Sequence, residues 1–250
     1  MTLAGGEGVL VVVPTYNEAE NIGEIIDAVL AGLPQASVLV VDDGSPDGTG
    51  AIVAARSGPR VHLLERESKQ GLGRAYVAGF AWGLERGFSR FVEMDADFSH
   101  DPADLPVLAA VTEHADVAIG SRYVPGGEVV GWSKGREFLS RFGNTYARTL
   151  LGFPYRDATS GFRCYRRAVL EDIRLDDVAS EGYAFQIDMT YRAWRLGYTI
   201  REIPITFRDR REGNSKMSRA IVVEAVTSVA GWALRDRLGR RSRRMARRDA

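Results

Sequence analysis

The chain has 250 residues, of which 45% are hydrophobic and 26% are charged, a composition typical of soluble globular proteins. Its single cysteine excludes an internal disulfide, and no run of 18 apolar residues predicts a segment that spans a bilayer. Residues 1–8 contain neither the basic residue nor the apolar core of a secretory signal, so we expect none.

The formal net charge of zero hides an uneven distribution of charge. Residues 235–250 hold eight arginines and two aspartates, a net charge of +6, so the rest of the chain carries −6. An acidic body with a basic tail favours an anionic partner at one end. No nucleic-acid-binding motif accompanies the tail, so we expect no nucleic acid partner.

Through the first half of the chain, short apolar runs alternate with helical patterns. Asn17 is the expected cap of a helix whose apolar side chains recur at helical spacing up to Leu33. Asp101 followed by Pro102 predicts the start of a later helix. The expected strands are 9–13, 38–41, 61–64, 90–94 and 116–120, and the expected helices include 49–56 and 72–86. This alternation predicts an α/β fold with a mostly parallel, doubly wound sheet and helices on both of its faces.

After residue 120 the pattern is looser. Residues 122–135 are rich in glycine, polar and aromatic residues, which predicts a mobile loop. Helical segments near 136–151 and 184–196 bracket a strand-like run at 161–165. The last expected strand covers residues 198–207.

Residues 219–234 predict an amphipathic helix of about 15 residues. Val222, Val226, Val229 and Ala233 fall on one face, with more polar residues opposite. Such a helix is too short to span a membrane comfortably, and its arginine-rich continuation suits a surface of anionic lipid. We therefore expect peripheral association with a membrane. The alternative is a terminal helix packed on the body, followed by a disordered basic tail.

Two aspartates one residue apart, Asp95 and Asp97, follow the predicted strand at 90–94. Their carboxylates would emerge at the carboxyl end of a parallel strand, where open α/β sheets bind ligands. Two oxygen ligands on a short turn suit Mg²⁺ or Mn²⁺, with water and phosphate oxygens completing the coordination. Asp42 and Asp43 end another apolar run in the same way. The two acidic strand ends predict a cleft for a metal ion and a nucleotide.

Three further features predict contacts to a nucleotide. Residues 14–18 directly follow the first strand, where backbone and side chains can line a base or ribose. Asp42 or Asp43 could accept hydrogen bonds from the ring N–H and exocyclic amine of a guanine. Gly71 and Gly73 open a helix and would let its backbone approach a nucleotide closely. The fingerprints of Rossmann dinucleotide binders and P-loop enzymes are absent from the sequence, which argues against both classes.

Taken in order, these segments resemble the inverting glycosyltransferases of family 2, which have a GT-A fold. The motifs are Val13-Pro-Thr-Tyr-Asn-Glu18, Val41-Asp-Asp-Gly-Ser-Pro-Asp-Gly-Thr49, Gly71-Leu-Gly73, Met94-Asp-Ala-Asp-Phe-Ser-His100 and Gly120-Ser-Arg-Tyr123. Later motifs narrow the resemblance to polyprenyl-phosphate (dolichyl-phosphate) mannosyltransferases: Asp157-Ala-Thr-Ser-Gly-Phe-Arg163, Glu181-Gly-Tyr-Ala-Phe-Gln186 and Phe207-Arg-Asp-Arg-Arg-Glu-Gly-Asn-Ser-Lys216. The match covers about residues 8–220.

The resemblance implies transfer of mannose from GDP-mannose to polyprenyl phosphate in a membrane, with inversion, giving polyprenyl phosphate β-mannose. Mg²⁺ or Mn²⁺ on Asp95 and Asp97 would stabilise the departing GDP as a Lewis acid. Ser99 is an uncertain third ligand, because some members have glutamine there. The acceptor is already an anionic phosphate and needs cations rather than a base, so we interpret the neighbouring His100 as a polar loop residue.

The resemblance also implies which residues hold each substrate. Arg122, Arg210 and Lys216 match basic positions of the family, and their charge-assisted hydrogen bonds would hold the diphosphate and the acceptor phosphate together. Ser160 is a further expected contact to the acceptor phosphate. The expected contacts to the donor nucleotide are Pro14, Tyr16, Glu18, Asp42, Asp43, Gly71, Gly73, Asp95 and Ala96. The expected catalytic residues are Asp95, Asp97, Arg122, Arg210 and Lys216.

The expected organisation is a GT-A catalytic domain over residues 1–218, with a donor and metal half at about 8–120 and an acceptor half at 121–218. Residues 219–250 would contact the cytoplasmic face of the membrane, alone or with an integral-membrane partner protein. Two alternatives remain open. One is a glucosyltransferase that uses UDP-glucose, and the other is a non-catalytic GT-fold subunit that recruits a membrane partner.

Overall fold

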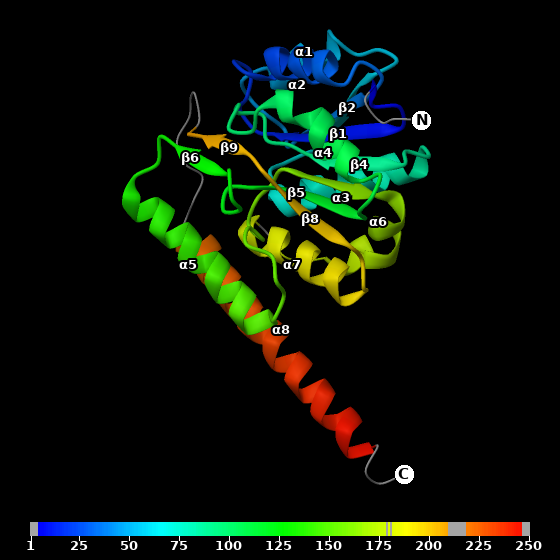
Figure 1. Ribbon diagram of the computed structural model, residues 1–250. Helices are drawn as coiled ribbons and strands as arrows, with labels where there is room; N and C mark the ends of the chain where they lie inside the picture. Colours follow the sequence, from blue (N-terminus) through cyan, green and yellow to red (C-terminus); the bar gives the residue numbers. More distant parts are fainter. Residues whose placement is uncertain (1–4, 179, 181, 210–218, 247–250) are drawn as a thin grey trace.

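The computed structural model describes residues 5–178, 180, 182–209 and 219–246. A seven-stranded sheet with helices on both faces forms the body, and a two-stranded sheet lies beside it (Figure 1). The strands are β1 (Val9–Thr15), β2 (Ser37–Asp42), β3 (Val61–Glu65), β4 (Arg90–Glu93), β5 (Val117–Ser121), β6 (Glu128–Val130), β7 (Arg163–Arg166), β8 (Ile200–Pro204) and β9 (Thr206–Arg208). The α-helices are α1 (Ile22–Gly32), α2 (Thr49–Ala54), α3 (Leu72–Glu85), α4 (Leu105–Val111), α5 (Lys134–Leu151), α6 (Arg167–Ile173), α7 (Gly182–Arg195) and α8 (Arg219–Ala246). Two 3₁₀ turns, η2 (Pro102–Asp104) and η3 (Leu175–Asp177), complete the order.

The main sheet confirms the predicted mostly parallel α/β fold. Its strand order is β3-β2-β1-β4-β7-β5-β8, and β7 alone among these strands runs antiparallel to its neighbours. The carboxyl ends of β1, β2 and β4 therefore meet at one edge of the sheet. Because β7 is antiparallel, its first residue, Arg163, lies opposite Glu93, the last residue of β4. The 157–162 segment therefore reaches the same edge as the Asp95 turn.

The sheet is buried on both faces, which explains why β1 is a continuous apolar run. Val9, Val11 and Val13 belong to a core cluster with α1 and α4, whereas Leu10 and Val12 belong to a cluster with α3, α6 and α7. Helix α3 approaches the sheet closely because it is rich in small residues. A Cβ on Gly83 would lie 2.5 Å from Leu10 Cδ2 and 2.6 Å from Phe91 Cε1.

Two local predictions for the first and last thirds of the body are wrong. Asn17 does not cap α1, which begins five residues later; it adopts a left-handed φ of 60°, and its N–H donates to Ser45 Oγ at 3.0 Å. The predicted strand at 198–207 divides at Ile205, whose N–H donates to the Ser121 carbonyl. Its second part, β9, pairs in parallel with β6, which lies inside the predicted loop.

The last helix is longer than predicted. Helix α8 spans 28 residues and continues through the arginine cluster instead of ending after about 15 residues. Val229 and Ala233 are buried against α5 and α7, whereas Val226 is 44% exposed, so part of the predicted apolar face packs on the body. Figure 1 shows α8 lying beside α5 and then projecting away from the sheet. In the part of the chain that the structure describes, no helix is long and apolar enough to cross a membrane.

We predict that Gly83→Ala destabilises the fold by about 1–3 kcal/mol, because its methyl group would overpack two core side chains. Urea unfolding measures the effect. Gly58→Ala is the matched control, since no heavy atom lies within 4 Å of its added Cβ. Equal midpoints for the two variants would show that α3 can move away from the sheet without cost.

Candidate active site

The Asp95–Ser99 turn after β4 is held by hydrogen bonds within the turn. Asp97 Oδ1 accepts bonds from the Ser99 N–H at 3.0 Å and from Ser99 Oγ at 2.6 Å, and Phe98 has a left-handed φ of 57°. Asp97 is 3% exposed, whereas the Asp95 side chain is 27% exposed. The Ser99 hydroxyl therefore orients Asp97, and its role as a metal ligand stays a prediction.

The two aspartates suit a divalent cation that brings its other ligands with it. Among the described residues, no group of three or more His, Cys, Asp or Glu side chains could hold a metal ion. Asp95 and Asp97 thus offer hard oxygen ligands but no complete protein cage. This donor set fits Mg²⁺ or Mn²⁺ completed by diphosphate and water, and it does not fit a structural zinc site.

His100 lies in the loop after β4, as expected, and is buried there against aromatic rings. It is 1% exposed and stacks on Phe162 with the ring centroids 5.0 Å apart. Phe207 contacts it edge-on, with a centroid distance of 5.3 Å. The Asp95 N–H lies 3.4 Å from His100 Nδ1, which accepts this bond. The imidazole therefore supports the Asp95–Ser99 turn.

The acidic end of β2 is engaged by donors of the protein. Asp42 Oδ1 accepts from Thr15 Oγ1 at 2.7 Å and from Ser45 Oγ at 2.6 Å. Asp43 forms an ion pair with Arg66 at 3.0 Å and accepts from the Gln70 N–H at 3.1 Å. These bonds stabilise the turn that follows β2 and compete with any contact to a base.

A pocket of about 470 Å³ lies beside this turn, at the ends of β2 and β3. The sequence predicted that Asp42 contacts a nucleotide, but it did not indicate that residues at the end of β3 line the same pocket. Its lining residues are Asp42, Gly44, Ser45, Pro46, Gly48, Gly50, Ala51, Glu65, Arg66 and Glu67. The pocket combines carboxylates with one guanidinium group, and its size suits a nucleobase.

The other expected nucleotide contacts differ in their surroundings. Pro14 lies at the end of β1 opposite Val41, and Lys69 Nζ lies 4.3 Å from the centroid of the Tyr16 ring. The Glu18 N–H donates to Thr49 Oγ1 at 3.0 Å. Ala96 is 4% exposed and belongs to the core cluster beneath the sheet edge.

The glycines at the start of α3 have local structural roles. Gly71 precedes the helix with a φ of 104°, a backbone conformation that residues with a Cβ rarely adopt. A Cβ on Gly73 would lie 2.5 Å from the Ser180 carbonyl oxygen and 3.1 Å from the Phe185 ring. Gly73 therefore lets α3 approach the segment that leads into α7, which explains the glycine without a nucleotide.

Arg122 forms a buried ion pair with Asp157. Arg122 Nε donates to Asp157 Oδ2 at 2.8 Å, and Nη2 donates to Asp157 Oδ1 at 2.6 Å and to Thr159 Oγ1 at 2.8 Å. Burial lowers the pKa of Arg122, but the charge of Asp157 and its hydrogen bonds with Arg122, together with nearby tyrosines, raise the pKa above its ordinary value. Burial raises the pKa of Asp157, but the charge and hydrogen bonds of Arg122, together with the charge of Arg163, lower it below its ordinary value.

The two predicted phosphate-binding residues that the structure describes, Arg122 and Ser160, use donors within the protein. Ser160 is 2% exposed, and its hydroxyl donates to the Gly120 carbonyl at 2.6 Å. Arg122 is 3% exposed and uses Nε and Nη2 within the protein. Arg210 and Lys216 lie outside the described residues.

Arg163, at the end of the 157–163 motif, is fully buried and holds this segment against α7. Its guanidinium group donates to the carbonyls of Ala158, Ser160 and Gln186 at 2.6, 2.7 and 2.8 Å. Glu93, its cross-strand neighbour, accepts from Gln186 Nε2 at 2.6 Å. Burial raises the pKa of the Glu93 carboxyl to about 7, although Arg163 and Gln186 favour its charged form.

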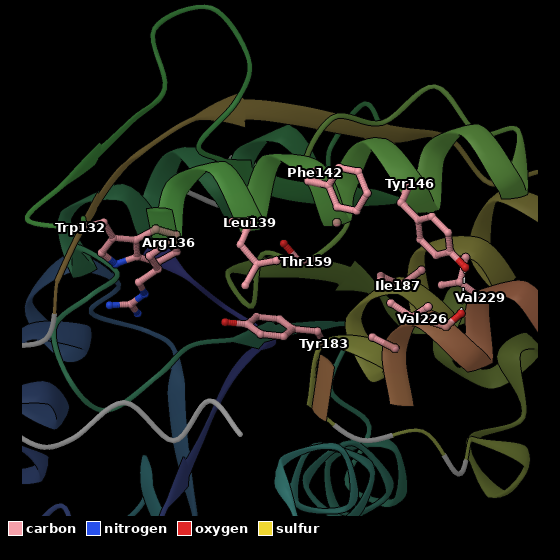
Figure 2. A pocket seen from close by; sticks show the side chains of 13 residues that line it. Trp132, Arg136, Leu139, Phe142, Tyr146, Thr159, Tyr183, Ile187, Val226 and Val229 are labelled. Carbon is pink, nitrogen blue, oxygen red and sulfur yellow. Dashed lines mark hydrogen bonds between the residues drawn. The ribbon is translucent and has the colours of Figure 1, made fainter. Parts of the chain in front are cut away.

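An apolar cavity of about 120 Å³ lies between α5, α7 and α8, and sequence reasoning missed it. Figure 2 shows Trp132 and Arg136 at one end, Val226 and Val229 at the other, and Thr159 between them. The Arg136 guanidinium lies 4.0 Å from the Trp132 ring and pairs with Asp209 at 2.8 Å. The sequence could not reveal this cavity, because its walls come from three helices far apart in the chain.

The sheet edge thus carries two acidic turns and a base-sized pocket, and Thr159, close in sequence to Gly161 beside Asp95, lines the apolar cavity. The glycosyl transferase family 2 model matches residues 10–174. The chain belongs to glycosyl transferase family 2, which confirms the resemblance inferred from its motifs.

Two curated relatives match nearly the whole chain. A polyprenol monophosphomannose synthase of Mycolicibacterium smegmatis is 54% identical over 92% of this chain and 89% of its own length. An undecaprenyl-phosphate mannosyltransferase of Micrococcus luteus is 51% identical over 90% of this chain and 94% of its own.

Solved structures of glucosyl-3-phosphoglycerate synthase from Mycobacterium tuberculosis share the fold. The complex with phosphoglyceric acid has a TM-score of 0.67 and 22% identity, and covers 90% of this chain and 80% of that chain. The complex with Mn²⁺, UDP-glucose and phosphoglyceric acid has a TM-score of 0.66, 21% identity and the same coverage. This likeness confirms the expected GT-A fold.

We predict that Asp157→Asn lowers the free energy of unfolding by about 3–5 kcal/mol, because it leaves the Arg122 charge buried without its partner. Unfolding by urea across a pH series measures this loss. The pKa of Asp157 is lowered by folding, so its contribution is present above the unfolded-state pKa and is lost as the pH falls through the folded-state value. The gap between wild type and variant should therefore be constant near neutrality and shrink in acid.

Glu171→Gln is the control, because it removes an exposed ion pair with Arg167 that contributes about 0–1 kcal/mol. Similar losses in the two variants would contradict a special role for the buried pair.

Proposed function

We propose that this protein transfers mannose from GDP-mannose to a polyprenyl phosphate, with inversion, to give polyprenyl phosphate β-mannose. The observation that carries the proposal is the apolar cavity beside the acidic strand ends. Thr159 lines the cavity, and two residues later the Cβ position of Gly161 lies 4.0 Å from Asp95 Oδ1. A lipid in the cavity thus lies close to a donor held at Asp95. The names of both close relatives support the same reaction class.

The donor nucleotide is proposed to lie along the ends of β1, β2 and β4. The pocket at β2 and β3 takes the base, and its carboxylates favour the adjacent N–H donors of guanine over the acceptor-flanked N–H of uracil. Tyr16 and the Pro14–Glu18 segment line the path from this pocket towards Asp95. The diphosphate then reaches Asp95 and Asp97.

Mg²⁺ or Mn²⁺ on Asp95 and Asp97 is proposed to complete the donor site. Solved structures of a protein that shares this fold contain Mn²⁺, which supports a divalent-metal cofactor. When bound, the ion supplies Lewis-acid stabilisation of the departing diphosphate. Ser99 holds Asp97 in the orientation that this binding needs.

The acceptor phosphate is proposed to lie at the Trp132–Arg136 end of the cavity. Among the described side chains, Trp132 Nε1 and Arg136 Nε are buried donors without a hydrogen-bond acceptor. A phosphate oxygen would satisfy them, and Arg136 adds a positive charge. Arg210 and Lys216 remain proposed as further cations. Arg122 positions Thr159 and Asp157 here, and its direct contact to phosphate stays a prediction.

The phosphate oxygen needs no base, because it is already an anion. It attacks the anomeric carbon from the face opposite the nucleotide. A bond forms between the phosphate oxygen and the anomeric carbon as the bond between that carbon and the diphosphate oxygen of GDP breaks. The cations must hold two negative groups together, which is electrostatic stabilisation of the transition state.

The membrane is proposed to meet α5 and α8 on the cytoplasmic face. Phe138 and Phe142 of α5 are 71% and 58% exposed, and Arg141 lies between them in the sequence. Exposed aromatic rings with neighbouring arginines suit the interface of an anionic bilayer. The cavity opens beside these rings, so the polyprenyl chain could pass directly from lipid into the protein.

We predict that purified protein transfers labelled mannose from GDP-mannose, and not glucose from UDP-glucose, to polyprenyl phosphate in detergent with Mg²⁺. EDTA and Asp97→Ala should each remove nearly all transfer, because both remove the proposed metal. Glu171→Gln, which removes only the exposed ion pair with Arg167 on α6, is the control. Transfer from UDP-glucose alone would overturn the donor. Nucleotide binding without transfer from either donor would favour a non-catalytic subunit or a missing membrane partner.

We also predict that deleting residues 237–250 lowers transfer to acceptor in anionic vesicles more than transfer to a short, soluble acceptor. The deletion removes basic residues that attract lipid and retains Asp236, which pairs with Arg195. Parallel assays on the two acceptors measure the difference. An equal loss on both would show that the tail is needed for folding or chemistry, not for membrane contact.

A further inference from the structure

Helix α5 presents one glycine to the apolar cavity. Apart from Phe142, the residues of α5 that line the cavity recur at the spacing of one helical face: Arg136, Leu139, Ser140, Gly143 and Tyr146. Residues three and four positions apart on a helix share a face. Gly143 lies in the middle of this row, so a side chain at this position would point towards the cavity.

Close packing does not explain Gly143. At Gly73, Gly79 and Gly83 of α3, an added Cβ would lie 2.5 Å from a neighbouring atom, which leaves no room for a side chain. At Gly143, no described heavy atom lies within 4 Å of that position. A glycine inside a helix destabilises it relative to alanine, because it gives the unfolded chain more freedom. What Gly143 contributes is therefore open space on the cavity side of α5.

The cavity is much smaller than a polyprenyl chain. Its volume is about 120 Å³. An apolar cavity of about 150 Å³ holds one benzene molecule, which has six carbons. On the same scale, this cavity holds about one isoprene unit of five carbons. The remaining units of a polyprenyl chain would lie outside it.

The polar end of the cavity determines which isoprene unit enters. Trp132 and Arg136 line this end, and Trp132 Nε1 and Arg136 Nε are buried donors without an acceptor among the described residues. Ile187, Val226 and Val229 line the other end (Figure 2). A ligand that joins an anion directly to a short apolar group matches both ends. In the proposed acceptor, the phosphate and the first isoprene unit are joined in this way.

We propose that the cavity binds the isoprene unit next to the acceptor phosphate, and that Gly143 is the residue whose small size admits it. This inference rests on the proposed function, because it takes a polyprenyl phosphate as the acceptor. The protein would then recognise the acceptor by its phosphate and one unit, and the bilayer would hold the rest of the chain. Gly143 would determine specificity for the acceptor without contacting the donor.

Gly143→Leu tests the role of the open space. Leucine favours a helix, and no described atom blocks its Cβ, so the variant should unfold in urea at or above the wild-type midpoint. Its side chain would fill most of the space that five carbons need. We expect it to bind dimethylallyl phosphate, which has one isoprene unit, at least about tenfold more weakly than wild type. Binding of GDP with Mg²⁺ should change by less than about twofold. Isothermal titration calorimetry measures both ligands.

Gly231→Leu is the matched control. Gly231 also lies inside a helix, α8, and no described heavy atom lies within 4 Å of its Cβ position. It is not among the described residues that line the cavity. This variant should bind dimethylallyl phosphate and GDP as wild type does. Equal losses of dimethylallyl phosphate binding in the two leucine variants would overturn the role of Gly143, as would no loss in Gly143→Leu.

A series of acceptors tests the single-unit cavity on the wild-type protein, so this test depends on no variant. Binding should strengthen at least about tenfold from methyl phosphate to dimethylallyl phosphate, because four more carbons become buried. Farnesyl phosphate, which has three isoprene units, should bind within about threefold of dimethylallyl phosphate. A further gain of about tenfold with each added unit would overturn the proposal, since it would require a site for several units.

The proposed function and the proposed role of the cavity can fail separately. Suppose that Gly143→Leu loses dimethylallyl phosphate binding but wild type transfers no mannose from GDP-mannose to polyprenyl phosphate. The cavity is then a site for a prenyl phosphate, and the proposed function fails. If wild type transfers mannose and Gly143→Leu does so with an unchanged KM for polyprenyl phosphate, the function stands and the role of the cavity fails.

Discussion

The buried pair between Arg122 and Asp157 is the interaction on which the arrangement of the site depends. It joins the end of β5 to the segment that precedes β7, and Arg122 Nη2 extends the link to Thr159. Glu202 of β8 accepts from the backbone N–H groups of Arg156 and Asp157 at 2.8 Å. Two fully desolvated charges gain little net stability over an apolar pair. The ion pair instead fixes the position of residues 157–161.

That segment lies between the two substrates in the proposed reaction. Thr159 lines the apolar cavity, Ser160 donates to the Gly120 carbonyl, and the Cβ position of Gly161 lies 4.0 Å from Asp95 Oδ1. Arg163 holds the same segment from the other side through backbone carbonyls. The proposed acceptor and donor sites therefore both adjoin one short segment that is anchored on two sides. Such a scaffold can keep two reacting groups in register, which is the main entropic requirement of a transfer between them.

The charges at the proposed site explain its need for a metal ion and further cations. The sheet edge presents Asp42, Asp43, Asp95 and Asp97, a set that would repel a diphosphate without a divalent cation. Several nearby positive groups are already paired inside the protein: Arg122 with Asp157, and Arg66 with Asp43. Arg136 lies at the cavity against Trp132 and also pairs with Asp209, and its Nε has no hydrogen-bond acceptor among the described residues. In the proposed complex, the metal ion would bind the donor diphosphate and Arg136 would bind the acceptor phosphate.

The amino-acid sequence by itself determined the family, the α/β alternation and the two acidic strand ends. These features are local, because strands, turns and motifs follow from neighbouring residues. The tertiary structure decided what each side chain contacts. Arg122 and Ser160 use their donors within the protein, Ser99 orients Asp97, and His100 is buried between aromatic rings. The apolar cavity likewise exists only in three dimensions. Its walls come largely from α5, α7 and α8, and a linear pattern carries no information about which distant side chains will meet when these segments pack.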